Sequence, residues 1–434
     1  MVPHTLKRLA AVGLAAALAL SLAACGKGGS TSSDSTDSGG AATLKLWTHA
    51  AGAEAELAAT EQIVADFNAS QDKYTVEVQA FPQDSYNQSV TAAAASNSLP
   101  CILDIDGPNV PNWAWGGYLA PLDGMDEQLS KFLPSTVGAW NGKNYSAGAF
   151  DVALAMYARK SVLEQNKIRI PTIDQPWTGE EFNAALATLK ATGQWKTPLD
   201  LGTGDASEWW PYAYSPMLQS FGGDLIDRAE YKSADGVLNG AEALAWATWF
   251  RGLVEQGYMP VKSGKDPGAD WLNGKSAINW NGSWGAEAAR EKFGDDVLFL
   301  PPPDFGHGPK IGGGSWQWGL SAQCENPEGA LDYLKFALQD KNVAAVAEAV
   351  GTIPATDGAA ALVPGYEAGG VNDIFRQYSK EFAEVRPQTP GYPFIATTFT
   401  KAAQDIVNGG DPQGALDQAV AAIDANQKSN NNFQ

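Results

Sequence analysis

Hydrophobic and polar positions follow two different periods along the first quarter of the chain. The alternation typical of strands occupies residues 43–50 and 74–81, and a short apolar strand that ends in acids occupies residues 101–106. Apolar residues at helical spacing mark residues 54–70, and residues 85–98 form a second predicted helix. This β-α-β-α-β order predicts an α/β fold that opens as a doubly wound sheet.

Helical patterns dominate the remainder of the chain. Residues 144–168 are expected to form a strand, a crossing segment and a helix. Further helices are predicted at 176–193 (capped by Thr178), 241–257 and 326–340, and the aromatic run 209–223 is expected to be a helix or a pair of loops. The Pro/Gly-rich run 301–314 predicts a crossover between two domains, which the length of 434 residues also favours.

The stretch AINWNGSWGAE, residues 277–287, places two large aromatic residues beside a flexible backbone. Glycine and asparagine disfavour the interior of a helix, so the pattern predicts a strand at 275–279 that runs into a turn and a short helix. Trp280 and Trp284 then lie next to Gly282 and small polar side chains. Packing in the core and contact with a ligand that has flat apolar faces are the two interpretations.

The expected strand ends indicate where a ligand would lie. In doubly wound sheets, ligands bind beyond the carboxyl ends of the strands. This rule places Trp47, Thr48, His49, Asp106 and Asn109 near a cleft.

Composition and charge narrow the class of ligand. The formal net charge is −20, which argues against a nucleic-acid partner because an acidic surface repels phosphate backbones. The chain contains 15 Trp, 13 Tyr and 16 Phe, a high aromatic content that suits either a large core or a stacking ligand. With only three His residues, a His-built metal site is not expected, and no G-x-S-x-G nucleophile elbow is present.

The N-terminus has the features of an export signal. Lys7 and Arg8 precede an apolar run too short to span a membrane, and the run ends at the tetrapeptide LAAC, which resembles a bacterial lipobox. This pattern predicts a signal peptide at residues 1–24 and lipidation of Cys25. Residues 25–42 lack large apolar side chains and are predicted to be a flexible tether. An ordinary signal peptide cleaved after Ala24 and a buried cysteine are the alternatives.

Two further cysteines, Cys101 and Cys324, remain in the exported chain. Outside the cell they can form a disulfide. Sequence gives no distance between them, so a disulfide and two buried thiols are both open.

Several motifs occur in the order found in one family. They are LKLWTH, LPCILDID, YSAGAFDVALAMYARKSVL, PWTGEEF, GKSAINWNGSW, GTIPA, RPQTPGYPFIATTF and NGGDPQGALDQAV. Together they cover residues 43–425, and the chain resembles the ABC-transporter solute-binding proteins of family 1, the maltose-binding-protein type. One departure is Ala158-Arg159-Lys160, where the family has Tyr-Asn-Lys.

The resemblance implies an α/β fold of the periplasmic-binding-protein type II. Its two discontinuous domains are joined by a hinge, with the ligand cleft between them. We expect one lobe to comprise residues 43–150 plus 308–354, and the other 151–307 plus 355–434. The resemblance also implies a monomer anchored at the extracellular face of the cell membrane. It would deliver its ligand to the transmembrane subunits of an ABC permease, without enzymatic chemistry or a cofactor.

The expected ligand is an oligosaccharide, because sugars stack their C–H faces on aromatic rings and need paired hydrogen-bonding groups. In the family, the position matching Trp284 stacks on sugar, and Phe399 falls on another aromatic position. One of Trp209 and Trp210 is expected to face the cleft and the other the core. The predicted ligand-binding residues are Trp47, His49, Asp106, Asn109, Asp151, Glu208, Trp209, Trp210, Tyr212, Asn281, Trp284, Gly313, Ser315, Trp316, Gln317, Arg386, Tyr392 and Phe399.

Two other functions fit the sequence less well. A binding protein for a polyol, glycerol phosphate or peptide would use the same fold. A glycoside hydrolase would need two carboxylates flanking one bond, and Asp106, Asp151 and Glu208 are candidate acids.

Overall fold

The computed structural model describes residues 41–205, 208–264 and 267–433. From Ala41 onward the chain forms one compact unit. The predicted signal peptide, Cys25 and most of the predicted tether lie outside the described residues. The first strand begins at Ala42, one residue before the strand predicted at 43–50. None of the helices in the described part of the chain is long and apolar enough to cross a membrane.

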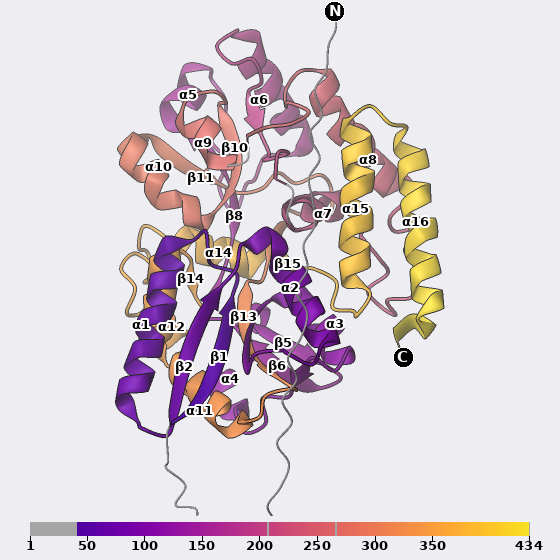
Figure 1. The fold of residues 1–434 in the computed structure, drawn as a ribbon. Helices are drawn as coiled ribbons and strands as arrows, with labels where there is room; N and C mark the ends of the chain where they lie inside the picture. The colour runs from indigo at the N-terminus through magenta and orange to yellow at the C-terminus, as the bar shows by residue number, and fades with distance from the viewer. Residues whose placement is uncertain (1–40, 206–207, 265–266, 434) are drawn as a thin grey trace, which may run out of the picture. The chain divides into compact units, whose positions relative to one another are not determined.

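The larger sheet has the strand order β2-β1-β3-β13-β6-β5, with β4 paired to β13 (Figure 1). Its strands are β1 (Ala42–Thr48), β2 (Tyr74–Ala80), β3 (Ile102–Asp106), β4 (Leu119–Ala120), β5 (Val137–Trp140), β6 (Lys143–Ala147) and β13 (Trp316–Ser321). β1 pairs in parallel with β2 and β3, as the opening pattern predicts. β13, from much later in the chain, pairs antiparallel with β3 and brings Trp316 opposite Asp106.

Helices from two separate parts of the chain, residues 54–129 and 327–360, surround this sheet. They are α1 (Glu54–Ser70), α2 (Gln83–Ala95), α3 (Val110–Trp115), α4 (Asp126–Leu129), α11 (Pro327–Ala337), α12 (Asp340–Val350) and α13 (Asp357–Ala360). α1 buries Ile63, Val64 and Phe67 and packs against α11 and α12. The Phe67 ring meets Tyr333 of α11 edge-on, with centroids 5.3 Å apart.

The smaller sheet has the order β11-β8-β10-β9. Its strands are β8 (Leu154–Arg159), β9 (Leu199–Asp200), β10 (Ile278–Gly282) and β11 (Val297–Leu300). The helices in this part of the chain are α5 (Lys160–Gln165), α6 (Gly179–Ala191), α7 (Trp209–Phe221), α8 (Ala241–Glu255), α9 (Pro267–Leu272) and α10 (Ala286–Phe293). α14 (Asp373–Phe382), from later in the chain, packs against β8. β10 lies inside the sheet, between β8 and β9, and all five of its residues are buried.

Two short strand pairs lie where the chain crosses between these sheets. β7 (Phe150–Asp151) pairs with β14 (Ile353–Pro354), and β12 (Ile311–Gly313) pairs in parallel with β15 (Ala383–Val385). The last helices, α15 (Tyr392–Val407) and α16 (Pro412–Ser429), lie side by side and pack against α7 and α8 (Figure 1).

Most predicted elements match the structure, and the two that differ from the prediction or decide between its alternatives are the aromatic run at 209–223 and the strand at 275–279. α1 has the predicted bounds, and Thr178 forms a full capping box with Glu181 at the start of α6. The aromatic run is a single helix, α7, even though Pro216 lies inside it. The strand predicted at 275–279 is wrong in its bounds, because pairing with β8 continues through Gly282 and turns Trp280 into a core residue.

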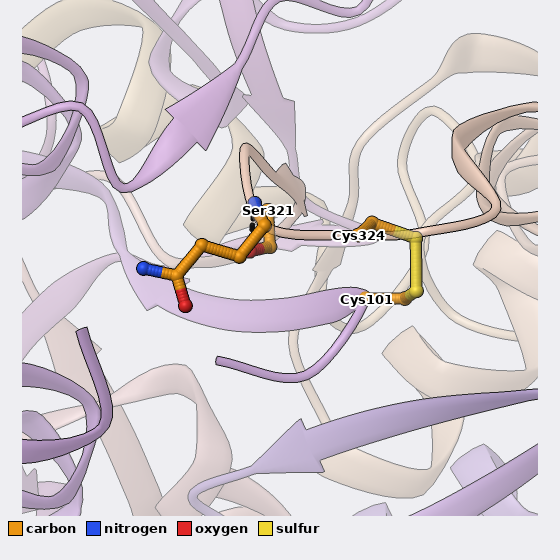
Figure 2. Close-up of a disulfide and its surroundings, with 4 residues drawn as sticks. Cys101, Ser321 and Cys324 are labelled. Carbon is orange, nitrogen blue, oxygen red and sulfur yellow. Dashed lines mark hydrogen bonds between the residues drawn. A yellow bond between two sulfur atoms is a disulfide. The ribbon is translucent and has the colours of Figure 1, made fainter. Parts of the chain in front are cut away.

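Cys101 and Cys324 form a disulfide, which resolves the alternative left open by the sequence. Figure 2 shows the bond, which joins the residue before β3 to the loop after β13. The Ser321 amide donates to the Cys101 carbonyl at 2.9 Å beside it. The bond closes a chain separation of 223 residues, and a link across so long a loop removes much entropy from the unfolded chain.

Candidate functional site

A cavity of about 310 Å³ is lined by residues from segments far apart in the sequence. Many of the predicted ligand-binding residues line it: Asp106, Glu208, Trp209, Tyr212, Trp284, Ser315, Trp316 and Arg386. Asp106 ends β3, Trp316 begins β13, Trp209 begins α7, and Trp284 follows β10. Elements of both the larger and the smaller sheet therefore contribute to the wall of the cavity.

A buried ion network forms the polar wall of the cavity. The Arg386 guanidinium donates to both carboxylate oxygens of Asp106, at 2.7 and 2.9 Å. It also donates to Glu208 Oε2 at 3.0 Å, and the Tyr392 hydroxyl donates to the same oxygen at 2.5 Å. Since Asp106 and Arg386 are almost fully buried, each charge depends on the other for compensation.

The surroundings of this network favour protonation of Glu208 and leave some polar atoms without partners. Burial raises the pKa of Glu208, with Arg386 opposing and Asp106 reinforcing the shift. The Arg386 guanidinium lies over the Tyr212 ring, 5.3 Å from its centroid. Neither Arg386 Nε nor the Tyr212 hydroxyl has a hydrogen-bond partner among the described residues. Such buried groups are expected to be satisfied by water or a ligand.

Aromatic rings form the other walls. Trp284 keeps 39% of its surface exposed, and its ring meets Trp209 edge-on at a centroid distance of 6.4 Å. Trp316 stacks on His49, with centroids 3.6 Å apart and planes within 8°. Flat faces beside hydrogen-bonding groups are the combination that binds sugar rings.

The two tryptophans of residues 277–287 have different environments. Trp280 is fully buried in β10 and its indole N–H donates to the Ala213 carbonyl at 3.3 Å. Trp284 folds back over Gly282, where any Cβ would collide with the indole ring. Gly282 is therefore required by the close approach of the exposed Trp284 ring. The Trp280 ring belongs to the core and the Trp284 ring to the cavity.

A second charged cluster lies behind Trp316. His49 Nδ1 is 2.6 Å from Asp104 Oδ2, which also accepts from the Thr48 hydroxyl at 2.9 Å. His49 Nε2 is 3.7 Å from Glu56 Oε2. Burial alone disfavours the charged imidazole, but Asp104 and Glu56 outweigh it and raise the pKa of His49. Burial, opposed by His49 and reinforced by Asp104, raises the pKa of Glu56 to about 7.

The structure places other predicted residues near the cavity but not in its lining. Gly313 and Gln317 line a second cavity of about 230 Å³, which shares Arg386 with the first. Both carboxylate oxygens of Asp151 are occupied: Oδ1 accepts from the Val152 and Gly314 amides, and Oδ2 accepts from two serine hydroxyls. Asp151 therefore holds the crossing segments together.

Several predicted residues lie in packed or supporting positions. Trp210 meets Tyr214 in the core while Trp209 lines the cavity, which answers the question of which indole faces it. Phe399 is fully buried against Trp246, and Trp47 packs on Phe81. Tyr392 is buried behind Glu208. Asn281 accepts from the Gly282 amide, and Asn109 is buried with its side-chain nitrogen lacking a partner among the described residues.

Sequence reasoning missed several residues that line the cavity. They are Glu56, Gln83, Phe150, Val152, Asp205, Gly314 and Val350. Glu56 lies in the first turn of α1 and Gln83 begins α2, each just after a strand of the larger sheet. The rule that ligands lie beyond strand ends could have identified both, had it been applied to the following helices as well as to the strands.

The raised pKa of Glu56 predicts a specific pH dependence of stability. The unfolded carboxyl titrates near 4.5 and the folded one near 7, so the folded state binds more protons between these values and stability falls as pH rises through this window. We expect Glu56→Gln to remove roughly 3 kcal/mol of this decline, at 1.36 kcal/mol per unit. Urea unfolding at intervals from pH 4.5 to 8 measures it. Glu54→Gln, exposed in the same helical turn, is the control, and identical pH profiles for Glu56→Gln and wild type would contradict the prediction.

Comparison with known proteins agrees with this architecture. The family described as "Bacterial extracellular solute-binding protein" matches residues 62–370. The chain is 24% identical to the galactooligosaccharide-binding protein of Bacillus subtilis, over 94% of each chain. It is also 24% identical to an uncharacterized lipoprotein of Streptomyces antibioticus, over 67% of this chain and 66% of that one.

A solved structure extends the likeness to the fold. The GacH receptor of Streptomyces glaucescens, determined unliganded and with acarbose, superposes with a TM-score of 0.74 at 22% identity, over 89% of this chain and 98% of that one. The predicted type II periplasmic-binding-protein fold is thereby confirmed. Because the family match covers most of its length, this chain belongs to the bacterial extracellular solute-binding proteins.

Proposed function

We propose that this protein is the extracellular ligand-capturing component of an ABC importer and that its ligand is an oligosaccharide. The observation that carries the proposal is the cavity, which is lined by the partly exposed ring of Trp284 together with hydrogen-bonding side chains. The exposed indole offers a platform for a sugar ring, and the Arg386 network offers donors and acceptors for hydroxyls.

Relatives support the same class of ligand. The Bacillus subtilis relative is named for galactooligosaccharide binding, and the GacH receptor was solved with acarbose. Each has aligned over nearly its whole length with this chain. In this proposal the protein acts by binding and release, and transmembrane permease subunits receive the ligand.

Domain closure is the proposed mode of capture. The proposed lobes are residues 43–150 plus 308–354 and residues 151–307 plus 355–434. Asp106 belongs to the first and Glu208 to the second, and Arg386 contacts both. A ligand touching both lobes would stabilise a closed arrangement by its differential affinity for it. The functional unit in this proposal is a monomer.

The function predicts binding without turnover. We expect calorimetry with a panel of neutral di- to tetrasaccharides, including galacto-, malto- and chito-oligosaccharides, to find a ligand of micromolar or tighter affinity. Chromatography after long incubation should return that ligand unchanged. Release of shorter sugars by the pure protein would favour a glycoside hydrolase, and selective binding of a polyol, glycerol phosphate or peptide would favour the other solute class.

Trp284→Ala and Trp280→Ala separate the two roles of the tryptophan pair. Loss of the exposed Trp284 ring should weaken sugar binding roughly thirtyfold or more, as at other aromatic hot spots, with a small change in thermal midpoint. Loss of the buried Trp280 ring should instead cost about 3–5 kcal/mol of stability. Calorimetric affinity and thermal midpoint are to be measured on the same preparations. Near-normal affinity in Trp284→Ala would remove this ring from the site.

The proposed location is the outer face of the cell membrane, through a lipid on Cys25. The sequence LAAC before a tether rich in Gly and Ser supports the anchor, and one relative is named a lipoprotein. Cells expressing the wild type should incorporate labelled palmitate into the protein, and cells expressing Cys25→Ala should not. An unlabelled wild type would contradict the anchor while leaving the ligand-binding proposal untouched.

A further inference from the structure

The charge of the cavity wall is unbalanced. Among the described lining residues, Glu56, Asp106, Asp205 and Glu208 are acidic and Arg386 is the one cation. Carboxylates can accept hydrogen bonds from the hydroxyls of a neutral sugar, but a cation would also compensate their charge. Some of these carboxyl groups are already compensated by Arg386, and others keep unused acceptor capacity.

The charge of Arg386 is compensated by carboxylates of the protein, although its Nε lacks a hydrogen-bond partner among the described residues. It holds Asp106 through two hydrogen bonds at 2.7 and 2.9 Å and reaches Glu208 Oε2 at 3.0 Å. With both residues of the Arg386–Asp106 pair about 95% buried, this cation is neutralised within the protein. It therefore leaves no positive charge to attract an anionic ligand.

Glu208 retains unused capacity. Both hydrogen bonds to its side chain, from Arg386 and Tyr392, end on Oε2. In the described part of the chain, Oε1 accepts none. The side chain is 32% exposed and lines the cavity, so this oxygen is available to a bound molecule.

Glu56 is the second carboxyl group that is only partly compensated. Its side chain makes no hydrogen bond to any described residue, and its nearest opposite charge is His49 Nε2 at 3.7 Å. His49 is already held by Asp104 at 2.6 Å on its other nitrogen. Glu56 keeps only 13% of its surface exposed, and it lines the same cavity as Glu208.

We propose that the cavity recognises a cationic sugar, an oligosaccharide carrying at least one protonated amine, with Glu56 and Glu208 as the groups that select the charge. The inference rests on the proposed function and names its ligand class. The aromatic rings would hold the sugar face, and the two carboxylates would accept from the ammonium group. An ammonium compensates charge that a neutral hydroxyl leaves buried and unpaired.

Two further observations support this reading of the wall. Tyr212 lines the same cavity as these acids, and its side chain is more than nine-tenths buried. Its hydroxyl lacks a hydrogen-bond partner among the described residues. Burial also raises the pKa of both glutamates, so a bound cation would displace protons from them.

The test compares pairs of sugars with the same ring skeleton, one neutral and one carrying protonated amines. Diacetylchitobiose is compared with its deacetylated diamine, and maltotriose with its singly aminated derivative, by calorimetry at pH 7 in low and high salt. We expect the amine to bind about tenfold tighter or more in at least one pair, the range set by hydrogen bonds to charged groups. That advantage should shrink in high salt. Two buffers of different ionisation enthalpy should reveal proton release with the amine and none with the neutral sugar.

Variants assign the selectivity to residues. Glu56→Gln and Glu208→Gln should each reduce the preference for the amine toward unity, measured as the ratio of amine affinity to neutral-sugar affinity within the same variant. Glu54→Gln, exposed in the same helical turn as Glu56, should leave the preference unchanged. Thermal midpoints of all three variants identify any that fail to fold, and the buffer comparison on the wild type tests the proposal without a variant.

The possible failures are distinguishable. Neutral sugars that bind as tightly as the amines, or more tightly, would overturn the cationic preference and leave the proposed function intact. A preference that survives both glutamine substitutions would overturn the assignment to Glu56 and Glu208. No binding of any sugar, neutral or aminated, would count against both the inference and the proposed function.

Discussion

The buried guanidinium of Arg386 is the interaction on which the cavity depends. Moving such a charge out of water is costly, and the cost is recovered only with well-placed carboxylates and hydrogen bonds. Asp106 comes from the end of β3, Glu208 from the start of α7, and Arg386 follows β15. Three segments separated by 102 and 178 residues are thus brought together by one charge. Removing either carboxylate would leave part of the buried guanidinium charge uncompensated, and apolar packing cannot replace that compensation.

Much of the fold could be predicted from local pattern. The helical spacing of residues 54–70 and the capping residue Thr178 are local signals, and the structure has both elements as predicted. β10 shows the limit. Its glycine and asparagines disfavour a strand locally, yet neighbours on both sides supply pairing that no local propensity reports.

The site was harder to predict because residue type does not reveal what a side chain already contacts. Trp209 and Trp210 are identical in sequence terms, but only one lines the cavity. Asp151 and Glu208 are both acids near strand or helix ends. The first has all its acceptor capacity taken by the protein, whereas the second keeps an oxygen open. Glu56 was missed because it lies in the first turn of α1, beyond the loop that follows β1.

The disulfide has a consequence for the register of β3 and β13, two central strands of the larger sheet. It clamps the beginning of β3 to the end of β13, and at the opposite ends of these antiparallel strands Asp106 faces Trp316. A slip of one residue would turn every side chain of a strand to the other face. The disulfide thus helps to keep Asp106 and Trp316 aligned at the cavity, although it lies at the opposite end of the strand pair. Reduction of this bond would weaken that alignment without changing any residue of the cavity.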